Sequence, residues 1–558
     1  MANAAIYLNP EAYNTSVKTL MGRHSAGESF LRGYIRHAAT DKFWFWNIAG
    51  QSDAEMDAFV ATVEPPTKPV TWIARGGHDQ LRTPGVAYIP TPNLAKHAWW
   101  RQHAGGNAYA VCGVTHTTAS HDIMDSIGNI QIAPVEPWDA LICTSRAVRA
   151  ATEAQLEATR DYMTHRLGVR THNSPMLETI PLGINCDEFA YSEESRKKWR
   201  AELDIPEDAI VALYVGRFNM QAKMNPVPMA LAMEAAAQKL GKPLYWVMSG
   251  WATNEEYAER YHGDTRAACP SVGYRIVDGR RKDVRFSIWS VADFFLSLSD
   301  NIQETYGLTP LEAMAAGLPC VVSDWDGYRE SVREGLDGFR IATYAPRPGL
   351  GRDLAYRYAH GWSDYSYYIG AASQMAAVDL EAAAEAIYTL AANPDLRKRM
   401  GQTAQKQARS ALDWKVLIPR YEALWEEQNK RRKAAPRAQD PRNVAQNPWR
   451  LDPFQMFASY PTEWLTPTTM VSLMPGMTWE EAKLRLTRKL ANYTSVMLPS
   501  IAEAEALYAA LAATPQALAA DLVAGFPPPR RQFMERSLLW FAKYGVARIH
   551  GRSFQIAP

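Results

Sequence analysis

The sequence has few cysteines and no long hydrophobic run, and each absence excludes a class of protein. Its 558 residues include only five cysteines, an odd number without the spacing of a disulfide framework or a zinc site. No apolar run reaches the ~20 residues that span a bilayer, and the first residues lack the charged start and apolar centre of a signal peptide. The sequence therefore predicts a cytoplasmic protein, and peripheral contact with a membrane surface remains an alternative.

An excess of one charge is also lacking. The chain carries 60 basic and 59 acidic residues, for a net charge of +1. No overall field therefore draws it toward nucleic acid or an anionic membrane, and we expect no nucleic-acid partner. The basic run 430–433 is interpreted as part of a solvated linker, with a lipid-binding patch as the alternative.

Short apolar runs alternate with longer amphipathic segments as far as residue 430. This alternation is typical of parallel sheets covered by helices. Two sets of predicted strands follow one another along the chain, which indicates two doubly wound α/β domains that face each other. The first set is 6–8, 43–48, 70–74, 86–89, 108–114 and 140–144, and the second is 210–215, 244–248, 274–277, 293–298 and 320–323.

The segment 292–327, ADFFLSLSDNIQETYGLTPLEAMAAGLPCVVSDWDG, is the most informative part of the chain. Its apolar start predicts a buried strand. After a polar loop, Thr309 is expected to cap a short helix, with Pro310 in the first turn and Glu312 completing a capping box. The amides at the helix start, from Gly307 to Thr309 through Leu308, suit an anion such as a pyrophosphate.

Two carboxylates, Glu304 and Glu312, flank this helix start and lie eight positions apart. The segment resembles the Glu-x7-Glu signature of the retaining glycosyltransferases of family 4, which have the GT-B fold. The resemblance implies that Glu304 approaches the transferred sugar and that Glu312 holds the ribose hydroxyls. The alternatives are a solvated loop acid for Glu304 and a plain helix cap for Glu312. The family's order continues at Ala313, Met314, Ala315, Gly317, Pro319, Ser323, Asp324, Gly327 and Glu330.

A second charged group follows the predicted strand 210–215. Gly216 and Arg217 end the strand, and Lys223 lies six positions after Arg217, before a helix that Asn225 is expected to cap. A strand-to-helix loop at the carboxyl edge of an open α/β sheet is where ligands bind. The spacing is similar to the family's phosphate-binding pair, which neutralises the leaving diphosphate without a metal. The alternative is a pair of surface cations.

The resemblance assigns further residues to the donor site. His116, after the apolar run YAVCGV, matches the family histidine that approaches the donor sugar, and a structural histidine is the alternative. Gly27 falls where the family has a glycine-rich loop, although Ala26 replaces one glycine of the usual pair. Backbone groups near Val277 and Asp278 are expected to meet the base.

No metal is expected at the site. Asp324 and Asp326 resemble a metal motif of the other glycosyltransferase fold, but they follow a strand of the second domain, where that motif does not belong. The Arg217 and Lys223 pair already supplies the positive charge.

The resemblance also divides the chain, and it covers roughly the part before residue 430. The expected parts are a first Rossmann-like domain at 1–185, a second at 186–410, a crossing helix at 411–430, a linker at 431–448 and an accessory domain at 449–558. The accessory domain is predicted to be mainly helical and similar to a winged helix. Its expected elements are a helix from Thr478 to about 495, helices at 501–513, 515–524 and 530–544, and a hairpin at 545–556. Its expected core residues are Phe454, Met456, Phe457, Trp464, Leu465, Trp540 and Phe541.

The sequence therefore predicts a retaining glycosyltransferase without a cofactor. Its donor would be a UDP-, GDP- or ADP-sugar and its acceptor a bacterial-type glycan, free or linked to lipid or protein. No side chain is placed as a nucleophile, so the resemblance implies front-face attack. The alternatives are an α-glucan synthase or phosphorylase of the same fold, and a non-catalytic homologue that binds glycan or protein. Self-association through 449–558 is a further expectation.

Overall fold

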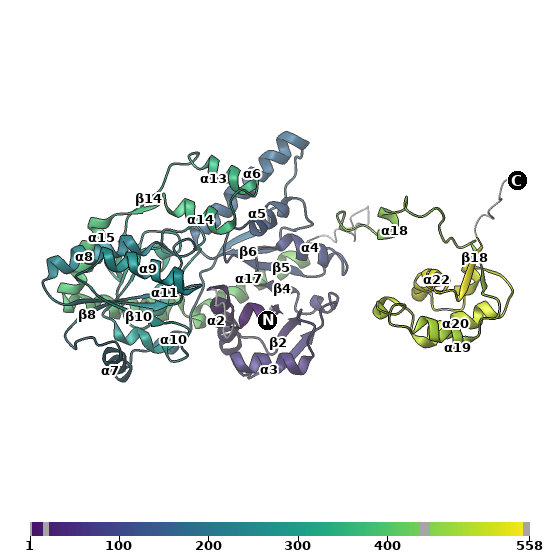
Figure 1. The fold of residues 1–558 in the computed structure, drawn as a ribbon, viewed down its shortest axis with the longest axis horizontal. Helices are drawn as coiled ribbons and strands as arrows, with labels where there is room; N and C mark the ends of the chain where they lie inside the picture. The colour runs from purple at the N-terminus through teal and green to yellow at the C-terminus, as the bar shows by residue number, and fades with distance from the viewer. Residues whose placement is uncertain (1–2, 15–21, 436–446, 551–558) are drawn as a thin grey trace. The chain divides into compact units, whose positions relative to one another are not determined.

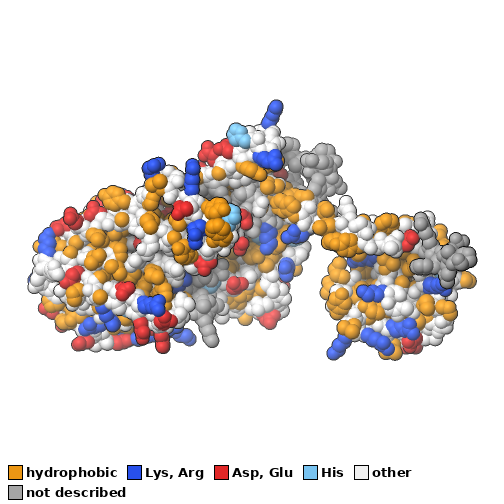
Figure 2. All heavy atoms as spheres, turned by 45° about the horizontal axis from the view of Figure 1, so that its top comes forward, with side chains coloured by type: hydrophobic (Ala, Val, Ile, Leu, Met, Phe, Trp, Pro, Cys, Tyr) orange, Lys and Arg blue, Asp and Glu red, His pale blue; other side chains and the backbone are white. Residues whose placement is uncertain are grey.

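The computed structural model describes residues 3–14, 22–435 and 447–550. The chain divides into two compact units, a large unit at Met1–Asn447 and a small unit at Pro448–Pro558. Within the described ranges, no helix is long and apolar enough to cross a membrane. Basic and acidic side chains are both present on the face shown in Figure 2.

The first sheet of the large unit has seven parallel strands in the order β3-β2-β1-β4-β5-β6-β7 (Figure 1). The strands are β1 (Ala5–Leu8), β2 (Phe43–Asn47), β3 (Val70–Ile73), β4 (Val86–Ile89), β5 (Ala110–Val114), β6 (Ala140–Cys143) and β7 (Met176–Thr179). The α-helices are α1 (Pro10–Tyr13), α2 (Gly22–His37), α3 (Asp53–Val63), α4 (Leu94–Arg101), α5 (His121–Gly128) and α6 (Arg146–Leu167).

The second sheet has six parallel strands in the order β10-β9-β8-β11-β12-β13. The strands are β8 (Ile210–Val215), β9 (Leu244–Gly250), β10 (Gly273–Asp278), β11 (Phe294–Ser297), β12 (Cys320–Ser323) and β13 (Gly338–Ile341). The α-helices before residue 343 are α7 (Glu193–Glu202), α8 (Pro226–Leu240), α9 (Glu255–Ala268), α10 (Val284–Ser287), α11 (Thr309–Ala315) and α12 (Tyr328–Ser331). The later elements are β14 (Thr343–Tyr344), α13 (Arg352–Ala359), α14 (Tyr365–Ser373), β15 (Ala377–Val378), α15 (Leu380–Ala392) and α16 (Pro394–Gln407).

The two Rossmann-like sheets confirm the fold predicted for the first 430 residues. Every predicted strand is present, and the central ones are buried parallel strands, which appear in the sequence as continuous apolar runs. The sequence predicted the edge strands β3 and β10 but missed the other two, β7 and β13, whose side chains are partly buried. Cys112, Cys143 and Cys320 are buried in strands.

Helix α17 (Trp414–Ala434) carries the chain from the second sheet back to the first. Its apolar side chains join the core of the first sheet, and Trp425 at its centre is fully buried. Trp414 Nε1 donates to Ser29 Oγ of α2 at 2.8 Å. Gly33 makes this packing possible, because a Cβ there would lie 2.4 Å from the Trp414 side chain. The crossing helix thus extends past residue 430, and most of the predicted linker lies outside the described residues.

The small unit has a three-stranded sheet in the order β17-β16-β18, with antiparallel pairing. Its strands are β16 (Met470–Leu473), β17 (Ala517–Leu518) and β18 (Ala547–His550), and its helices are α18 (Pro453–Met456), α19 (Trp479–Leu486), α20 (Ile501–Ala512), α21 (Ala519–Val523) and α22 (Pro528–Lys543). Val471, Leu507, Leu522, Leu538 and Phe541 lie in its core.

Several details predicted for the small unit were wrong. The helix that Thr478 caps ends at Leu486, because the apolar residues that follow, such as Leu490 and Val496, are exposed and leave no packed face to hold a longer helix. The segment 515–524 begins with strand β17 because it pairs with β16. Phe454, Met456, Phe457 and Trp464 are exposed and do not belong to the core. Of the predicted hairpin, residues 551–556 lie outside the described residues.

Candidate active site

The candidate site lies at the carboxyl edge of the second sheet, where the loops after β8 and β11 meet. Lys223, in the loop after β8, places Nζ 3.0 Å from Oε2 of Glu304, in the loop after β11. Their side chains are 23% and 14% exposed. Burial alone would raise the pKa of Glu304, but the Lys223 charge and hydrogen bond and the amides of Thr305 and Tyr306 outweigh it, so the pKa lies below its ordinary value. Glu304 is therefore a carboxylate at neutral pH.

Arg217 lies in the same loop as Lys223. Its side chain is half-buried, and its Nε is buried without a hydrogen-bond partner among the described residues. Gly216 precedes it in a tight turn, where a Cβ would lie 2.6 Å from the Tyr214 hydroxyl. A guanidinium held this way keeps donors for an anion, which is the chemistry expected of a phosphate-binding residue.

The start of α11 differs from the prediction. Leu308 is the cap residue, its backbone is already helical (φ −78°, ψ −29°), and no side chain caps the helix. The Thr309–Glu312 capping box was therefore wrong, because Thr309 is itself the first helical residue. The turn before it depends on Gly307, which has φ +80° and approaches Tyr328 so closely that a Cβ would lie 2.1 Å from the ring.

The Glu312 carboxyl group is consequently not used as a cap. Burial raises its pKa from 4.5 to about 7, with Arg285 lowering it and Glu188 raising it. Glu312 thus changes charge near neutral pH and keeps oxygen atoms that can accept hydrogen bonds from a ligand.

His116 reaches the site from the first sheet, two residues after β5 ends. Its carbonyl oxygen accepts a hydrogen bond from Thr305 Oγ1 at 3.2 Å. Thr144 Oγ1, after β6, donates to the Thr305 carbonyl oxygen at 3.2 Å. The structure therefore brings His116 beside the residue that follows Glu304, although the two lie far apart in the sequence.

Gly27 does not lie in a loop, so that part of the prediction was wrong. It is an interior residue of α2, and a Cβ there would lie 2.3 Å from the Ala12 carbonyl oxygen. Gly27 thus permits a close approach of α2 to α1. The next residue, Glu28, is buried and contacts Arg32 at 2.7 Å and Arg285 at 3.1 Å.

At the end of β10, Val277 is buried and Asp278 is exposed. Asp278 pairs with Arg280 at 2.8 Å, and this hydrogen bond lowers the pKa of the carboxyl group. The backbone of Val277 and Asp278 lies at the carboxyl edge of the sheet. Contact of these backbone groups with the nucleotide base remains a prediction.

Asp326 has a role that the sequence did not reveal. Its Oδ1 accepts a hydrogen bond from Ser145 Oγ of the first Rossmann-like domain at 2.6 Å. Its φ of +41° is unusual for a residue with a side chain, and burial raises its pKa to about 7. In the described part of the chain, no group of three His, Cys, Asp or Glu side chains suits a metal ion.

The sequence analysis also missed an aromatic segment between β14 and β15. Burial raises the pKa of Tyr365 in this segment, and its interactions with the Thr117 side chain, next to His116, and with the charge of Arg217 lower it. The signal in the sequence was the aromatic density of YRYAHGWSDYSYY, residues 356–368.

Part of the chain is similar in sequence to known proteins. Residues 195–347, which include Arg217, Lys223, Glu304 and Glu312, match the family model described as glycosyl transferases group 1. A D-inositol 3-phosphate glycosyltransferase of Streptomyces scabiei is 25% identical over 262 residues, covering 45% of this chain and 56% of that protein. A lipopolysaccharide 1,2-N-acetylglucosaminetransferase of Salmonella typhimurium is 25% identical over 167 residues, covering 29% and 42%. The chain spans about half the length of these curated relatives.

Among solved structures, Anabaena HepE in complex with UDP is 15% identical, with a TM-score of 0.49 over 76% of this chain and 100% of that one. A sucrose-phosphate synthase from Thermosynechococcus elongatus is 15% identical, with a TM-score of 0.46 over 76% and 99%. The segment 195–347, which lies in the second Rossmann-like sheet and its helices, is thus similar to group 1 glycosyltransferases, and the chain carries an additional compact unit at Pro448–Pro558.

Proposed function

We propose that the protein is a retaining glycosyltransferase that moves a sugar from a UDP-, GDP- or ADP-sugar to a hydroxyl group of a glycan. The observation that carries this proposal is the contact of Lys223 with Glu304 beside Arg217. It places two cations and one carboxylate within one strand-edge site. A nucleoside-diphosphate sugar needs this combination, with cations for the diphosphate and an acceptor of hydrogen bonds for the sugar.

In the proposed reaction, Arg217 and Lys223 bind the diphosphate. The bond between the sugar's anomeric carbon and the phosphate oxygen breaks, and the two cations stabilise the charge that develops on the leaving phosphate. The acceptor hydroxyl attacks from the same face, and its proton passes to the departing phosphate oxygen. Front-face attack preserves the anomeric configuration and requires no protein nucleophile.

Glu304 and His116 are proposed to hold the sugar, and Glu312 to hold the ribose. The low pKa of Glu304 keeps it charged and able to accept hydrogen bonds from sugar hydroxyls. The amides of Gly307, Leu308 and Thr309 are proposed to contact the diphosphate, and the backbone near Val277 and Asp278 the base. This set joins loops from both sheets.

The acceptor is proposed only as a class. The matching relatives are named for different acceptors, an inositol phosphate and a lipopolysaccharide. Both names fit a hydroxylated acceptor, and the second fits a lipid-linked glycan. We therefore propose a hydroxylated acceptor of the bacterial-type glycan class, free or linked to lipid or protein. We also propose that the first Rossmann-like domain ends at residue 185 and the second at residue 410, where the crossing segment begins.

The small unit is proposed to have a winged-helix-like arrangement and to select the acceptor or mediate self-association. From α20 to β18 its elements run helix, strand, helix, helix, strand, which supports the likeness.

A panel of nucleotide sugars tests the proposed function. Purified protein would be incubated with UDP-, GDP- and ADP-sugars, and the released nucleoside diphosphate would be measured with and without oligosaccharide acceptors. We expect release from at least one donor, and loss of release in Glu304→Gln. If the protein binds a nucleotide sugar but releases no nucleotide with any acceptor, the non-catalytic alternative replaces the proposal.

A further inference from the structure

An arm extends from the second sheet after β13, and we define it as residues 343–378. Strands β14 and β15 pair antiparallel at its base, and α13 and α14 lie between them. Figure 1 shows α13 and α14 at the top of the view, on the side where α5 and α6 lie. The match to the family model ends at residue 347, so nearly all of the arm lies outside it.

The arm is fixed to the first Rossmann-like domain by Tyr358. The backbone amide of His121 donates to the Tyr358 hydroxyl at 3.0 Å, and the two rings lie with centroids 3.7 Å apart. Tyr358 also stacks on Tyr368 of α14, with centroids 4.2 Å apart and ring planes 4° from parallel. Tyr358 is only 4% exposed, so its ring is packed between His121 of the first Rossmann-like domain and Tyr368 of the arm.

Helix α14 of the arm borders the candidate site. Burial raises the pKa of Tyr365, while interactions with the Thr117 side chain and with the charge of Arg217 lower it. Gly370 allows α14 to pack on the loop after β8, since a Cβ there would lie 3.0 Å from Gln221 Cγ. A ligand that leaves the region of Arg217 on this side therefore meets the arm.

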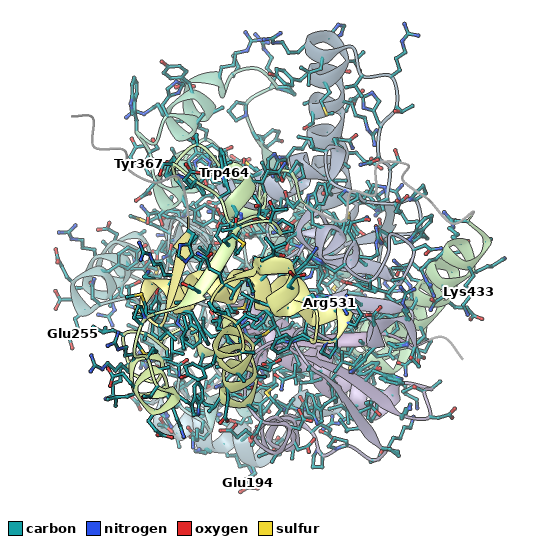
Figure 3. All side chains as sticks on the ribbon, turned by 90° about the vertical axis from the view of Figure 1, so that its right-hand side faces the viewer. Glu194, Glu255, Tyr367, Lys433, Trp464 and Arg531 are labelled. Carbon is teal, nitrogen blue, oxygen red and sulfur yellow. The ribbon has the colours of Figure 1, made fainter. Side chains whose placement is uncertain are left out.

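Farther out, the arm carries aromatic rings that no other part of the described chain covers. Tyr356 is 51% exposed and Trp362 63% exposed. The Tyr356 ring lies 4.1 Å from the His360 ring and 5.5 Å from the Trp362 ring, edge to face. Tyr367 is also exposed, and Figure 3 shows it projecting outward. These rings combine apolar faces with hydroxyl, imidazole and indole groups.

We propose that the arm binds the saccharide chain of the acceptor, a proposal that rests on the proposed function. The C–H faces of pyranose rings pack on aromatic faces, while their hydroxyls need polar groups at the ring edges, and the Tyr356, His360 and Trp362 cluster offers both. The position of the cluster, joined to the candidate site through Tyr365, suits an acceptor that extends outward from the point of transfer.

A lipid surface fits the arm less well. Membrane-binding helices expose aliphatic side chains beside an excess of basic ones. Here Ile369 of α14 is fully buried, and the exposed aliphatic side chains Leu350 and Met375 lie outside α13 and α14. Asp353 and Asp364 offset two of the three arginines of the arm, so the excess of basic charge is small.

The test compares the whole chain with the double variant Tyr356→Ala/Trp362→Ala. Binding to an array of immobilised neutral and acidic oligosaccharides would be measured, together with donor hydrolysis. We expect the wild-type protein to bind one saccharide class, the double variant to bind at least tenfold more weakly, and donor hydrolysis to stay within twofold. Tyr191→Ala, which removes a 49% exposed aromatic ring near α7, is the matched control and should bind as the wild type does.

Three results would overturn the proposal. They are no saccharide binding by the wild type, equal binding by the double variant, and binding to phosphatidylcholine–phosphatidylglycerol vesicles that the double substitution abolishes. Trp362→Ala alone repeats the test should the double variant unfold. Saccharide binding without any nucleotide release would contradict the proposed function and leave the arm proposal standing, so the two failures are distinguishable.

Discussion

Arg217 and Lys223 are the residues on which the proposed chemistry depends most. Removing either cation should raise the activation free energy of transfer by about 2–4 kcal/mol, because each cation stabilises the charge that develops on the leaving phosphate. The rate should then fall about 30- to 1,000-fold. Arg217→Ala and Lys223→Ala should therefore lose activity while keeping the fold. Initial rates and thermal unfolding of both variants check this expectation.

Lys239→Ala provides the control for the loss of a cation. Lys239 is 51% exposed at the end of α8 and pairs with Glu385 on the protein surface. We expect its removal to leave transfer unchanged, since exposed ion pairs contribute little. Near-normal rates in the Arg217 or Lys223 variant would show that the diphosphate binds elsewhere.

Transfer should not depend on a divalent metal. The two cations of the loop after β8 supply the positive charge that a metal would otherwise bring. EDTA-treated protein is therefore expected to keep its full rate. Restoration of a lost rate by magnesium or manganese would instead point to Asp324 and Asp326 as ligands.

Glu312 should make donor binding depend on pH. Burial raises its pKa from 4.5 to about 7, so the folded protein binds this proton more tightly than the unfolded chain does. The contribution of Glu312 to stability therefore falls as the pH rises from 4.5 to 7. Over the same interval the group becomes a carboxylate, a better acceptor for ribose hydroxyls, so affinity for an intact nucleotide sugar should rise through pH 7.

Glu312→Gln isolates this effect. Asp300 and Asp326 also have pKa values raised to about 7, and both remain in the variant. Titration calorimetry of a nucleotide sugar from pH 5.5 to 8.5 should show a rise in affinity for the wild type and a flatter profile for the variant. Parallel profiles would remove Glu312 from the nucleotide site.

For single residues, the sequence indicated which side chains belong to the candidate site better than it indicated which of them contact each other. Lys223 and Glu304 were both selected from motifs, but their direct contact was not predicted, because it depends on how two distant loops meet. Asp326 illustrates the same limit. Its partner, Ser145, belongs to the other Rossmann-like domain, and nothing in the local sequence identifies it.

Among the elements, the turn before α11 offers the sharpest test. Gly307→Ala would place a Cβ at φ +80° and 2.1 Å from the Tyr328 ring. We expect it to lower the free energy of unfolding by about 2–4 kcal/mol, from the backbone conformation and the forced shift of Tyr328 together. Chemical denaturation of the wild type and variant measures this change.

Gly263→Ala serves as the opposite case. Gly263 lies in α9, and its Cβ would meet no atom within 4 Å. Alanine there should stabilise the helix by about 0.5–1 kcal/mol. If both substitutions changed stability by the same amount, the tight turn at Gly307 would not be a constraint.

The elements also show why some predictions succeeded and others failed. Buried central strands were predictable because both of their faces are apolar. Of the four edge strands, β3 and β10 were predicted from their apolar residues, whereas β7 and β13, whose short sequences MLET and GFRI alternate with polar residues or begin with glycine, were missed. The capping box failed because Leu308 already has helical dihedral angles. The arm was missed because its short helices are held by ring contacts with His121, which depend on tertiary structure.

For the whole molecule, the small unit should be separable from donor chemistry. Its core is its own, with Leu507, Leu538 and Phe541 buried, whereas the proposed donor residues all lie in the large unit. A chain that ends at Asn447 should therefore bind and hydrolyse the donor at the wild-type rate. Transfer to the natural acceptor, or self-association, should be lost.

Exposed apolar residues of the small unit motivate this expectation. Phe454 is 71% exposed, Tyr460 79% and Trp464 61%, an unusual concentration of large rings outside a core. Leu538→Asp gives a second route to the same question, since it places a charge at a fully buried position of the small unit without shortening the chain. The truncated chain and Leu538→Asp should both keep donor hydrolysis. Both should lose the same property, which is either transfer to the natural acceptor or self-association. A truncated protein with unchanged acceptor kinetics and an unchanged oligomeric state in solution would show that the small unit has neither role.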